Sequence, residues 1–313
     1  MSKYKQINLT KIKRYSILRR KSKVKITNFA KSGKKKILFN NFISNLPNIL
    51  AAQKLKQVIN DIVLAHKHKK QVILMIGGHI IKCGLGPVII DLMKRKVITA
   101  IAMNGAASIH DFEIALAGTT SEEVTTALAD GSFGMAEETG KLINEAINHS
   151  ISDNTGMGES IGKKIIILKA PYKNLSILAT AYLLNIPATV HVAIGTDIIH
   201  QHPETNGAAI GNSSFIDFKI FTNEVSKLEN GVILNCGSAV IMPEVFLKAL
   251  SISRNLGYKV YKFTTVNFDM IQHYRPITNV ITRPTLKGGK GYAITGHHEI
   301  MIPLLAQAII EKL

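Results

Sequence analysis

Glycines and small polar residues follow several apolar runs of this chain. The run 71–76 ends in Gly77-Gly78-His79, and the run 97–103 ends in Asn104-Gly105-Ala106. Glycines at such positions let the backbone approach a ligand closely, and a helix that starts there offers unpaired N–H groups and a positive dipole end. This order of residue types is typical of strand-to-helix turns that hold a phosphate group.

The same arrangement recurs further along the chain. The run 188–194 ends in Gly195-Thr196-Asp197, and the run 231–234 is followed by Asn235-Cys-Gly-Ser238. Because the carboxyl ends of parallel strands meet at one edge of a sheet, we expect these residues to line a common crevice. His200 and His202 stand in the next loop without companion ligands at a recognisable spacing, so we predict no metal site and a hydrogen-bonding loop instead.

Two further polar clusters come late in the sequence. The stretch 267–276 holds Asp269, His273 and Arg275 directly behind an apolar segment, and so dense a polar set is costly near a core unless a ligand satisfies it. We therefore expect these three residues on the substrate side of the site. His298 opens the last helix and is expected to wall the pocket, although the segment also reads as a simple helix start.

Two other histidine positions have competing interpretations. His79 follows the first strand and either faces a ligand or packs, and the pair His110-Asp111 either borders the crevice or caps its helix. Serine hydrolase, P-loop and zincin motifs are absent from the sequence. Cys83 and Cys236 stand far apart in apolar surroundings, which favours reduced core thiols in a reducing, cytoplasmic compartment.

Alternating strand and helix patterns predict an α/β fold with a doubly wound, mostly parallel sheet. Residues 37–313 form one such domain, and 118–163 form a helical insertion beside the site. We predict a strand at each of the segments 71–76, 97–103, 164–168, 188–194, 231–234, 259–265 and 292–295. Helices are predicted at 45–66, 86–96, 108–117, 136–148, 176–184, 216–228, 243–255 and 299–312.

The charge of the chain is concentrated in a basic N-terminal arm, residues 1–36. The whole chain has 39 Lys and Arg against 21 Asp and Glu, and the arm holds 14 of the basic residues and no acid. We interpret it as a solvated or subunit-wrapping arm and disfavour nucleic acid, because few aromatic residues accompany the charges. No apolar run reaches the roughly 20 residues of a membrane span, so we expect no membrane association.

These motifs, taken in order, resemble the deoxyhypusine synthase superfamily over about residues 45–313. The chain is identified as similar to a bacterial branch of it and, more distantly, to the cofactor domain of archaeal lysine-oxoglutarate reductase/saccharopine dehydrogenase-like proteins. The resemblance is carried by six stretches, which are 77–84, 104–111, 185–197, 261–269, 275–276 and 292–304.

The resemblance implies a deoxyhypusine synthase-like NAD-binding fold, a homotetramer and NAD as cofactor. The implied cofactor contacts are Gly77, Gly78, His79, Asn104, Gly105, Ala106, Thr196, Asp197, Thr264, Thr265 and Asp269. One departure matters. The family's imine-forming lysine follows Arg-Pro in a Ser-Trp-Gly-Lys stretch, whereas Arg275-Pro276 is followed here by Ile-Thr-Asn-Val.

The sequence therefore favours an NAD-dependent enzyme that removes or returns a hydride on an amine, such as a polyamine or a basic amino acid. Asp269, His273, Arg275 and His298 are its candidate catalytic residues. One alternative is a true aminobutyl transferase, of the deoxyhypusine or homospermidine type, that uses Lys287 or Lys290. The other is a non-catalytic dinucleotide-binding regulatory or scaffold protein.

Overall fold

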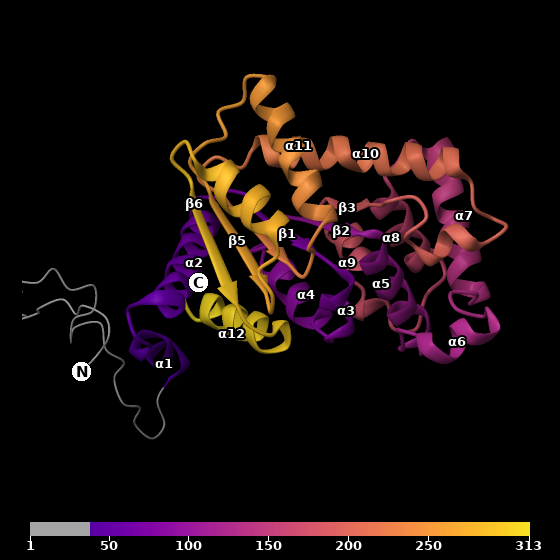
Figure 1. Cartoon of the computed structure of the whole chain (residues 1–313), viewed down its shortest axis with the longest axis horizontal. Coiled ribbons are helices and arrows are strands. Elements are labelled where there is room, and N and C mark those ends of the chain that lie inside the picture. Colours follow the sequence, from indigo (N-terminus) through magenta and orange to yellow (C-terminus); the bar gives the residue numbers. More distant parts are fainter. Residues whose placement is uncertain (1–37) are drawn as a thin grey trace, which may run out of the picture.

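The computed structural model describes residues 38–313, which form a six-stranded sheet between two layers of helices (Figure 1). The strands are β1 (Val72–Ile76), β2 (Ala100–Asn104), β3 (Ala188–His191), β4 (Val232–Cys236), β5 (Thr264–Asp269) and β6 (Lys290–Thr295). They run parallel in the order β3-β2-β1-β4-β5-β6. The predicted doubly wound α/β fold is confirmed, and the chain order reverses between β1 and β4. The predicted arm, 1–36, lies outside the described residues.

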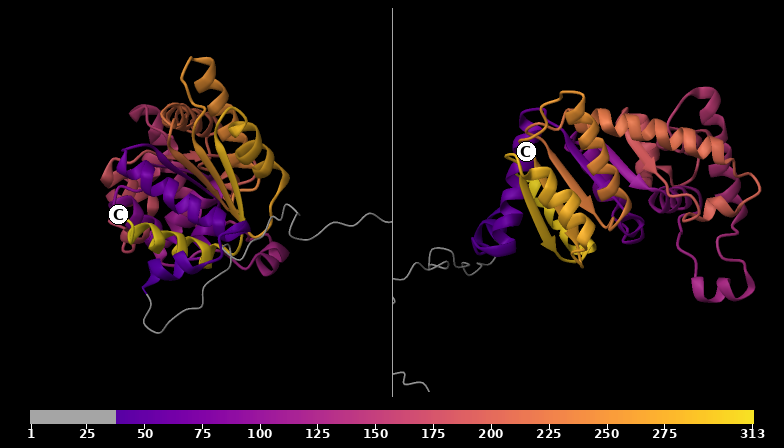
Figure 2. Two further views of the ribbon diagram at one scale, coloured as in Figure 1. Left: turned by 90° about the vertical axis from the view of Figure 1, so that its left-hand side faces the viewer. Right: turned by 45° about the horizontal axis from the view of Figure 1, so that its top comes forward.

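Helices cover both faces of the sheet, as the views in Figures 1 and 2 show. One face carries α2 (Leu50–Lys67), α4 (Gly86–Lys94), α5 (Gly105–Ala117), α8 (Met157–Ile167), α9 (Ile177–Leu184) and α12 (His298–Ile310). The other carries α10 (Gly207–Ser226), α11 (Ile241–Asn255) and the π-helical segment η5 (Pro276–Thr282). Every residue of β1, β4 and β5 is buried, as expected for parallel strands covered on both faces.

The remaining helices are α1 (Phe39–Asn45), α3 (Gly78–Lys82), α6 (Val124–Asp130) and α7 (Glu137–Asp153). The segment from β2 to β3 contains α6 and α7, and Figure 2 shows the α6 region projecting from the body of the molecule. Short 3-10 turns complete the chain: η3 (Lys173–Leu175), η4 (Ile198–Gln201) and η6 (Arg283–Thr285). Within 38–313, no helix is long and apolar enough to cross a membrane.

The strand predicted at 164–168 is wrong, because these residues end helix α8. The glycine-rich residues before it start the same helix. Its glycines allow close packing: a Cβ on Gly158 would lie 2.0 Å from the carbonyl oxygen of Ala188, and one on Gly162 would lie 2.6 Å from that of Leu178. The glycines therefore bring α8 against β3 and α9, a reason that sequence spacing does not reveal.

The strand predicted at 259–265 is shifted in the structure, where β5 covers 264–269 instead. The apolar residues before it lie outside regular structure, and the Glu229 carboxylate accepts the N–H groups of Tyr261 and Lys262 at 2.7 and 2.9 Å. The buried strand carries polar residues, such as Asn267 and Asp269, that sequence patterns assign to a loop. Thr264 and Thr265 consequently begin the strand and do not end it.

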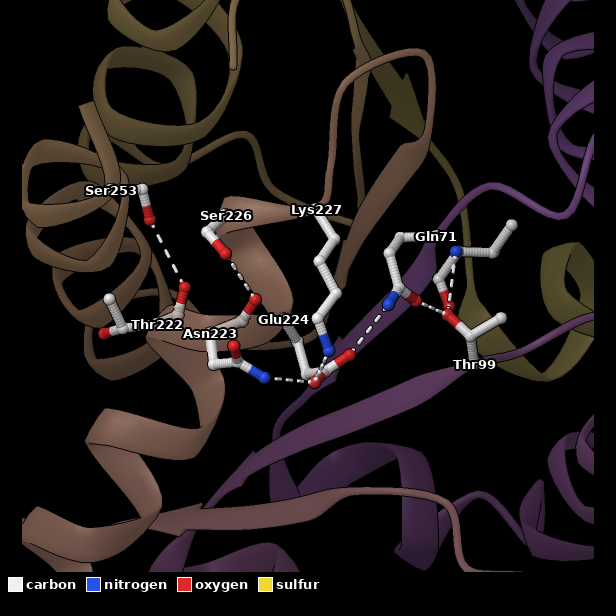
Figure 3. Close-up of polar contacts among 9 residues, drawn as sticks. Gln71, Thr99, Thr222, Asn223, Glu224, Ser226, Lys227 and Ser253 are labelled. Carbon is white, nitrogen blue, oxygen red and sulfur yellow. Dashed lines mark hydrogen bonds and ion pairs between the residues drawn. The ribbon is translucent and has the colours of Figure 1, made fainter. Parts of the chain in front are cut away.

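A polar network joins α10 to the starts of β1 and β2, and Figure 3 shows its members. The buried Glu224 carboxylate accepts hydrogen bonds from Gln71 Nε2 at 2.7 Å and from Lys227 Nζ at 2.7 Å. Gln71 in turn accepts from the hydroxyl of Thr99, which also receives the N–H of Val72 at 3.0 Å. These bonds fix the amino-terminal edge of the sheet.

Asp217 of α10 joins α8 to the outer strand β3. Its Oδ2 accepts the backbone N–H of Gly158 at 2.9 Å and that of Val190 at 2.8 Å, and its side chain is fully buried. Burial raises the pKa of this carboxyl to about 8. The side chain thus supplies the hydrogen bond that an edge strand lacks on its open side.

We predict that Asp217→Ala lowers the free energy of unfolding by about 2–4 kcal/mol, since it leaves two buried N–H groups without acceptors. Asp217→Asn keeps a carbonyl acceptor and should retain most of the stability. Urea unfolding followed by circular dichroism measures both. Equal losses in the two variants would contradict the hydrogen-bonding role.

Candidate functional site

The carboxyl ends of β1 and β4 meet at the point where the strand order reverses. The N–H of Gly77 donates to the carbonyl oxygen of Cys236 at 3.1 Å. A Cβ on Gly77 would lie 2.1 Å from the carbonyl oxygen of Gly237, which itself has a φ of +69°. The close approach therefore requires glycine at position 77, and the turn after β4 favours it at 237. In doubly wound folds this reversal marks the ligand crevice.

Two histidines lie beside this contact. His298, the first residue of α12, is 1% exposed, and its Nε2 donates to the carbonyl oxygen of Phe268 at 3.0 Å. Its other ring nitrogen, Nδ1, is buried and has no hydrogen-bond partner among the described residues. The rings of His79 and His298 meet edge to face with centroids 5.8 Å apart. The structure thus brings together two predicted site histidines.

The turn after β1 also packs against the start of α5. A Cβ on Gly78 would lie 3.1 Å from Cδ2 of His110 and 3.4 Å from Cβ of Ala106. Asn104 caps α5, because its Oδ1 accepts the N–H of Ala107 at 3.0 Å. The polar residues that follow β1 and β2 therefore lie side by side, as the sequence predicts.

Asp197 reaches this cluster from the loop after β3. A Cβ on Gly105 would lie 2.0 Å from its Oδ2, so glycine makes room for the carboxyl. Asp197 is 8% exposed, and Oδ2 has no hydrogen-bond partner within the described part of the chain. Burial raises the pKa of this carboxyl to about 6. A buried oxygen without a partner is costly, and such atoms are frequent at binding sites.

A hollow of about 210 Å³ opens beside Asp197. Ala106, Thr196 and Asp197, all predicted site residues, contribute to its wall. Sequence reasoning missed other residues of the wall, including Lys82, Glu113 of α5 and, from the region around α6, Glu122 and Phe133. The only signal for Glu113 was its position one helical turn after His110. Carboxylates outnumber ammonium groups in this wall, which favours a cationic guest.

His110 is held by a chain of hydrogen bonds at the wall of the hollow. Its Nδ1 lies 2.7 Å from Oγ1 of Thr120, and this hydroxyl donates to Glu113. Thr139 donates to the other oxygen of Glu113 at 3.1 Å. Burial raises the pKa of Glu113, but the hydrogen bonds from these three residues outweigh it and hold the pKa below its usual value. His110 is therefore firmly oriented.

The neighbouring Asp111 has a structural role. Its carboxylate is buried and accepts the hydroxyl of Ser176 at 2.6 Å and the N–H groups of Ile177 and Leu178 at 2.7 and 3.1 Å. It thus caps α9 rather than its own helix, and the start of α9 is fixed against α5. Burial raises the pKa of Asp111 to about 6.

Several predicted site residues lie apart from this cluster. Thr264 and Thr265 begin β5 at the opposite edge of the sheet, where the hydroxyl of Thr264 donates to Asp61 at 2.7 Å. Asp269, in contrast, ends the same strand and is buried at the carboxyl edge, the edge at which the candidate site lies. His273 and Arg275 are exposed.

Arg275 forms an ion pair, with its Nε 3.3 Å from Oε1 of Glu244. His200 and His202 make local contacts: Nδ1 of His200 accepts the N–H of Gly195 at 3.1 Å, and Nε2 of His202 donates to the carbonyl oxygen of Gly134 at 2.8 Å. Within 38–313, no group of three or more His, Cys, Asp or Glu is arranged to hold a metal ion.

No protein-family model and no curated protein matches this chain. Solved structures do match it. A candidate LOR/SDH protein from Methanococcus maripaludis S2 has a TM-score of 0.50 and 16% identity, covering 89% of this chain and 71% of its own. A candidate deoxyhypusine synthase from Entamoeba histolytica has a TM-score of 0.50 and 11% identity, covering 90% and 96%.

AgrE, solved in a ternary complex with ornithine and NAD⁺, matches with a TM-score of 0.51 and 14% identity over 83% of this chain. The matched part is 33% of AgrE, so the present chain spans a third of that protein. At these identities the matches define the fold. The chain has the fold of the deoxyhypusine synthase-like structures, as the sequence resemblance predicts.

We predict that Asp197 makes stability depend on pH. Its folded pKa, about 6, exceeds the ordinary value of 3.8, so its contribution is present below pH 4 and is lost as pH rises through 6. Between pH 4 and pH 7, the free energy of unfolding of wild type should therefore fall by about 2–3 kcal/mol relative to that of Asp197→Asn. Urea unfolding at both pH values measures this difference. Parallel behaviour of the two proteins would contradict it.

Proposed function

We propose that this protein is an NAD(H)-dependent enzyme that removes a hydride from, or returns it to, a small amine. The observation that carries the proposal is the convergence of glycine turns and buried unpartnered atoms at the carboxyl edge of the sheet. Nδ1 of His298 and Oδ2 of Asp197 lack partners in the described chain, and both lie against these turns. The strand order is the one associated with dinucleotide binding.

The residues at this edge fit a dinucleotide. Gly77 and Gly78 carry no side chain after β1, and the start of α5, a helix of 13 residues, lies beside them. We assign the pyrophosphate to the Gly77-Gly78 turn, with Asn104, Gly105 and Ala106 next to it. Thr196 and Asp197 then border the cofactor from the loop after β3. A bound nicotinamide would accept or donate the hydride.

The hollow beside Asp197 is our candidate for the substrate end. Glu113 and Asp197 give it acidic walls, which attract an ammonium group, and His110 is oriented there to exchange a proton. Asp269 and His298 lie at the same edge of the sheet and stay in the proposal as substrate-side residues. His273 and Arg275 are exposed and would need the substrate to extend over the loop after β5.

The two lysines proposed for the aminobutyl-transferase alternative lie away from the carboxyl edge of the sheet. Lys290 is the first residue of β6, and the strand carries the chain about 16 Å from there to the carboxyl edge. Lys287 precedes it in the same turn, with its Nζ 6.0 Å from the ring of Tyr261. Neither amine lies near the Gly77-Gly78 turn. The hydride-transfer proposal does not depend on them.

We predict that wild-type protein binds NAD⁺ in calorimetric titration and that Gly78→Val weakens binding at least about tenfold, or 1.4 kcal/mol. The added methyl groups would press on His110 and on the backbone where the pyrophosphate is assigned. Gly211→Val in α10 is the matched control, because nothing lies within 4 Å of its Cβ position. Unchanged affinity in Gly78→Val would refute the assignment.

We also predict that His298→Ala abolishes formation of NADH from NAD⁺ with putrescine, spermidine or ornithine. Affinity for NAD⁺ should stay within about tenfold, because the side chain acts on the substrate side. Absorbance of NADH measures turnover, and calorimetry measures binding. If wild type binds NAD⁺ tightly without turnover on a wide amine panel, the regulatory alternative replaces the enzyme.

A further inference from the structure

A second hollow lies at the amino-terminal edge of the sheet, far from the candidate active site. Its volume is about 720 Å³, and it is bounded by α2 and by the segments that lead into β4, β5 and β6. The exposed side chain of Leu64 gives it apolar surface. This volume is in the range of pockets that bind small molecules.

Basic side chains converge on this hollow from three segments of the chain. Lys70 comes from the turn after α2, Lys262 precedes β5, and Lys290 begins β6, while His68 adds an imidazole. Asp61 is the acid among the described residues that line it. The wall therefore carries more positive than negative charge.

The Asp61 carboxylate already has partners within the protein. Its carboxylate accepts from Lys290 Nζ at 3.1 Å and from the Thr264 hydroxyl at 2.7 Å. The ammonium groups of Lys70 and Lys262, by contrast, form no ion pair with any described residue. Two lysines that line one hollow thus have ammonium groups without an ion-pair partner among the described residues, and their charges add to a common positive field.

Two glycines allow the turn before β6 to pack closely at the rim of the hollow. Gly288 has a φ of +106°, and a Cβ on Gly289 would lie 2.9 Å from the carbonyl oxygen of Phe263. The turn from Lys287 to Lys290 therefore needs its glycines to pack against the backbone of Phe263. On the facing side, Glu229 accepts the N–H groups of Tyr261 and Lys262 and thereby fixes the segment that carries the second lysine.

We propose that this hollow binds a small polyanion, a molecule with two or more linked phosphate groups. Lysines are point charges that suit phosphate oxygens, and their separation over three segments suits several charges better than one. Leu64 would contact an uncharged part of the same molecule. The proposal is independent of the function assigned to the opposite edge.

Calorimetric titration with inorganic pyrophosphate tests the site. Wild type should bind, and Lys70→Gln/Lys262→Gln should bind at least about tenfold more weakly because the uncompensated charges are gone. Lys141→Gln/Lys219→Gln is the matched control: it removes the same net charge from α7 and α10, and it should bind within about twofold of wild type. Thermal unfolding checks that each variant is folded.

Gly78→Val should retain the pyrophosphate binding that is lost in Lys70→Gln/Lys262→Gln, which separates this site from the proposed dinucleotide turn. Equal weakening in the two lysine pairs would show a nonspecific charge effect and overturn the proposal. So would absence of binding to wild type, or loss of binding in Gly78→Val alone. Tighter binding of single-stranded DNA through Lys70 and Lys262 would identify a nucleic-acid surface and also overturn it.

Discussion

The contact between the turns after β1 and β4 is the constraint on which the site depends. Gly77 lies so close to the Gly237 carbonyl that a single methyl group would overlap it, and its N–H is bonded to Cys236. Because the two strands leave the sheet in contact, their following elements must diverge to opposite faces. His298 approaches the same contact from α12, with its ring near Gly237.

The sheet could be predicted because its strands are buried on both faces and therefore read as short apolar runs. The starts of β1 and β4 were found to within a residue or two for this reason. Helix α8 could not be recognised, since its glycines serve contacts with Ala188 and Leu178 that lie distant in the sequence. Strand β5 was displaced because its buried polar residues look like a loop, and only the neighbouring strands reveal their place.

The candidate site was predictable to the same extent. Residues at strand ends, such as Gly78, Asn104 and Asp197, share one edge by topology alone, so the pattern of strands locates them. Which of them touch depends on long-range packing, as in the pair Gly105 and Asp197. The placement of Thr264 failed with the displaced strand, and the chain from His110 to Glu113 passes through Thr120, which no local pattern connects to them.

The projecting region around α6 carries a consequence for how such a site can diversify. Phe133 and Glu122 reach the hollow from this region, whereas Ala106 and Asp197 belong to the edge of the sheet. No residue of α6 itself is buried, so changes there cost the fold little. Substitutions or length changes between β2 and β3 can therefore alter which guest is admitted while the turns at the strand ends stay intact. Selectivity and cofactor geometry are encoded in separable parts of the chain, and new specificities can arise without rebuilding the sheet.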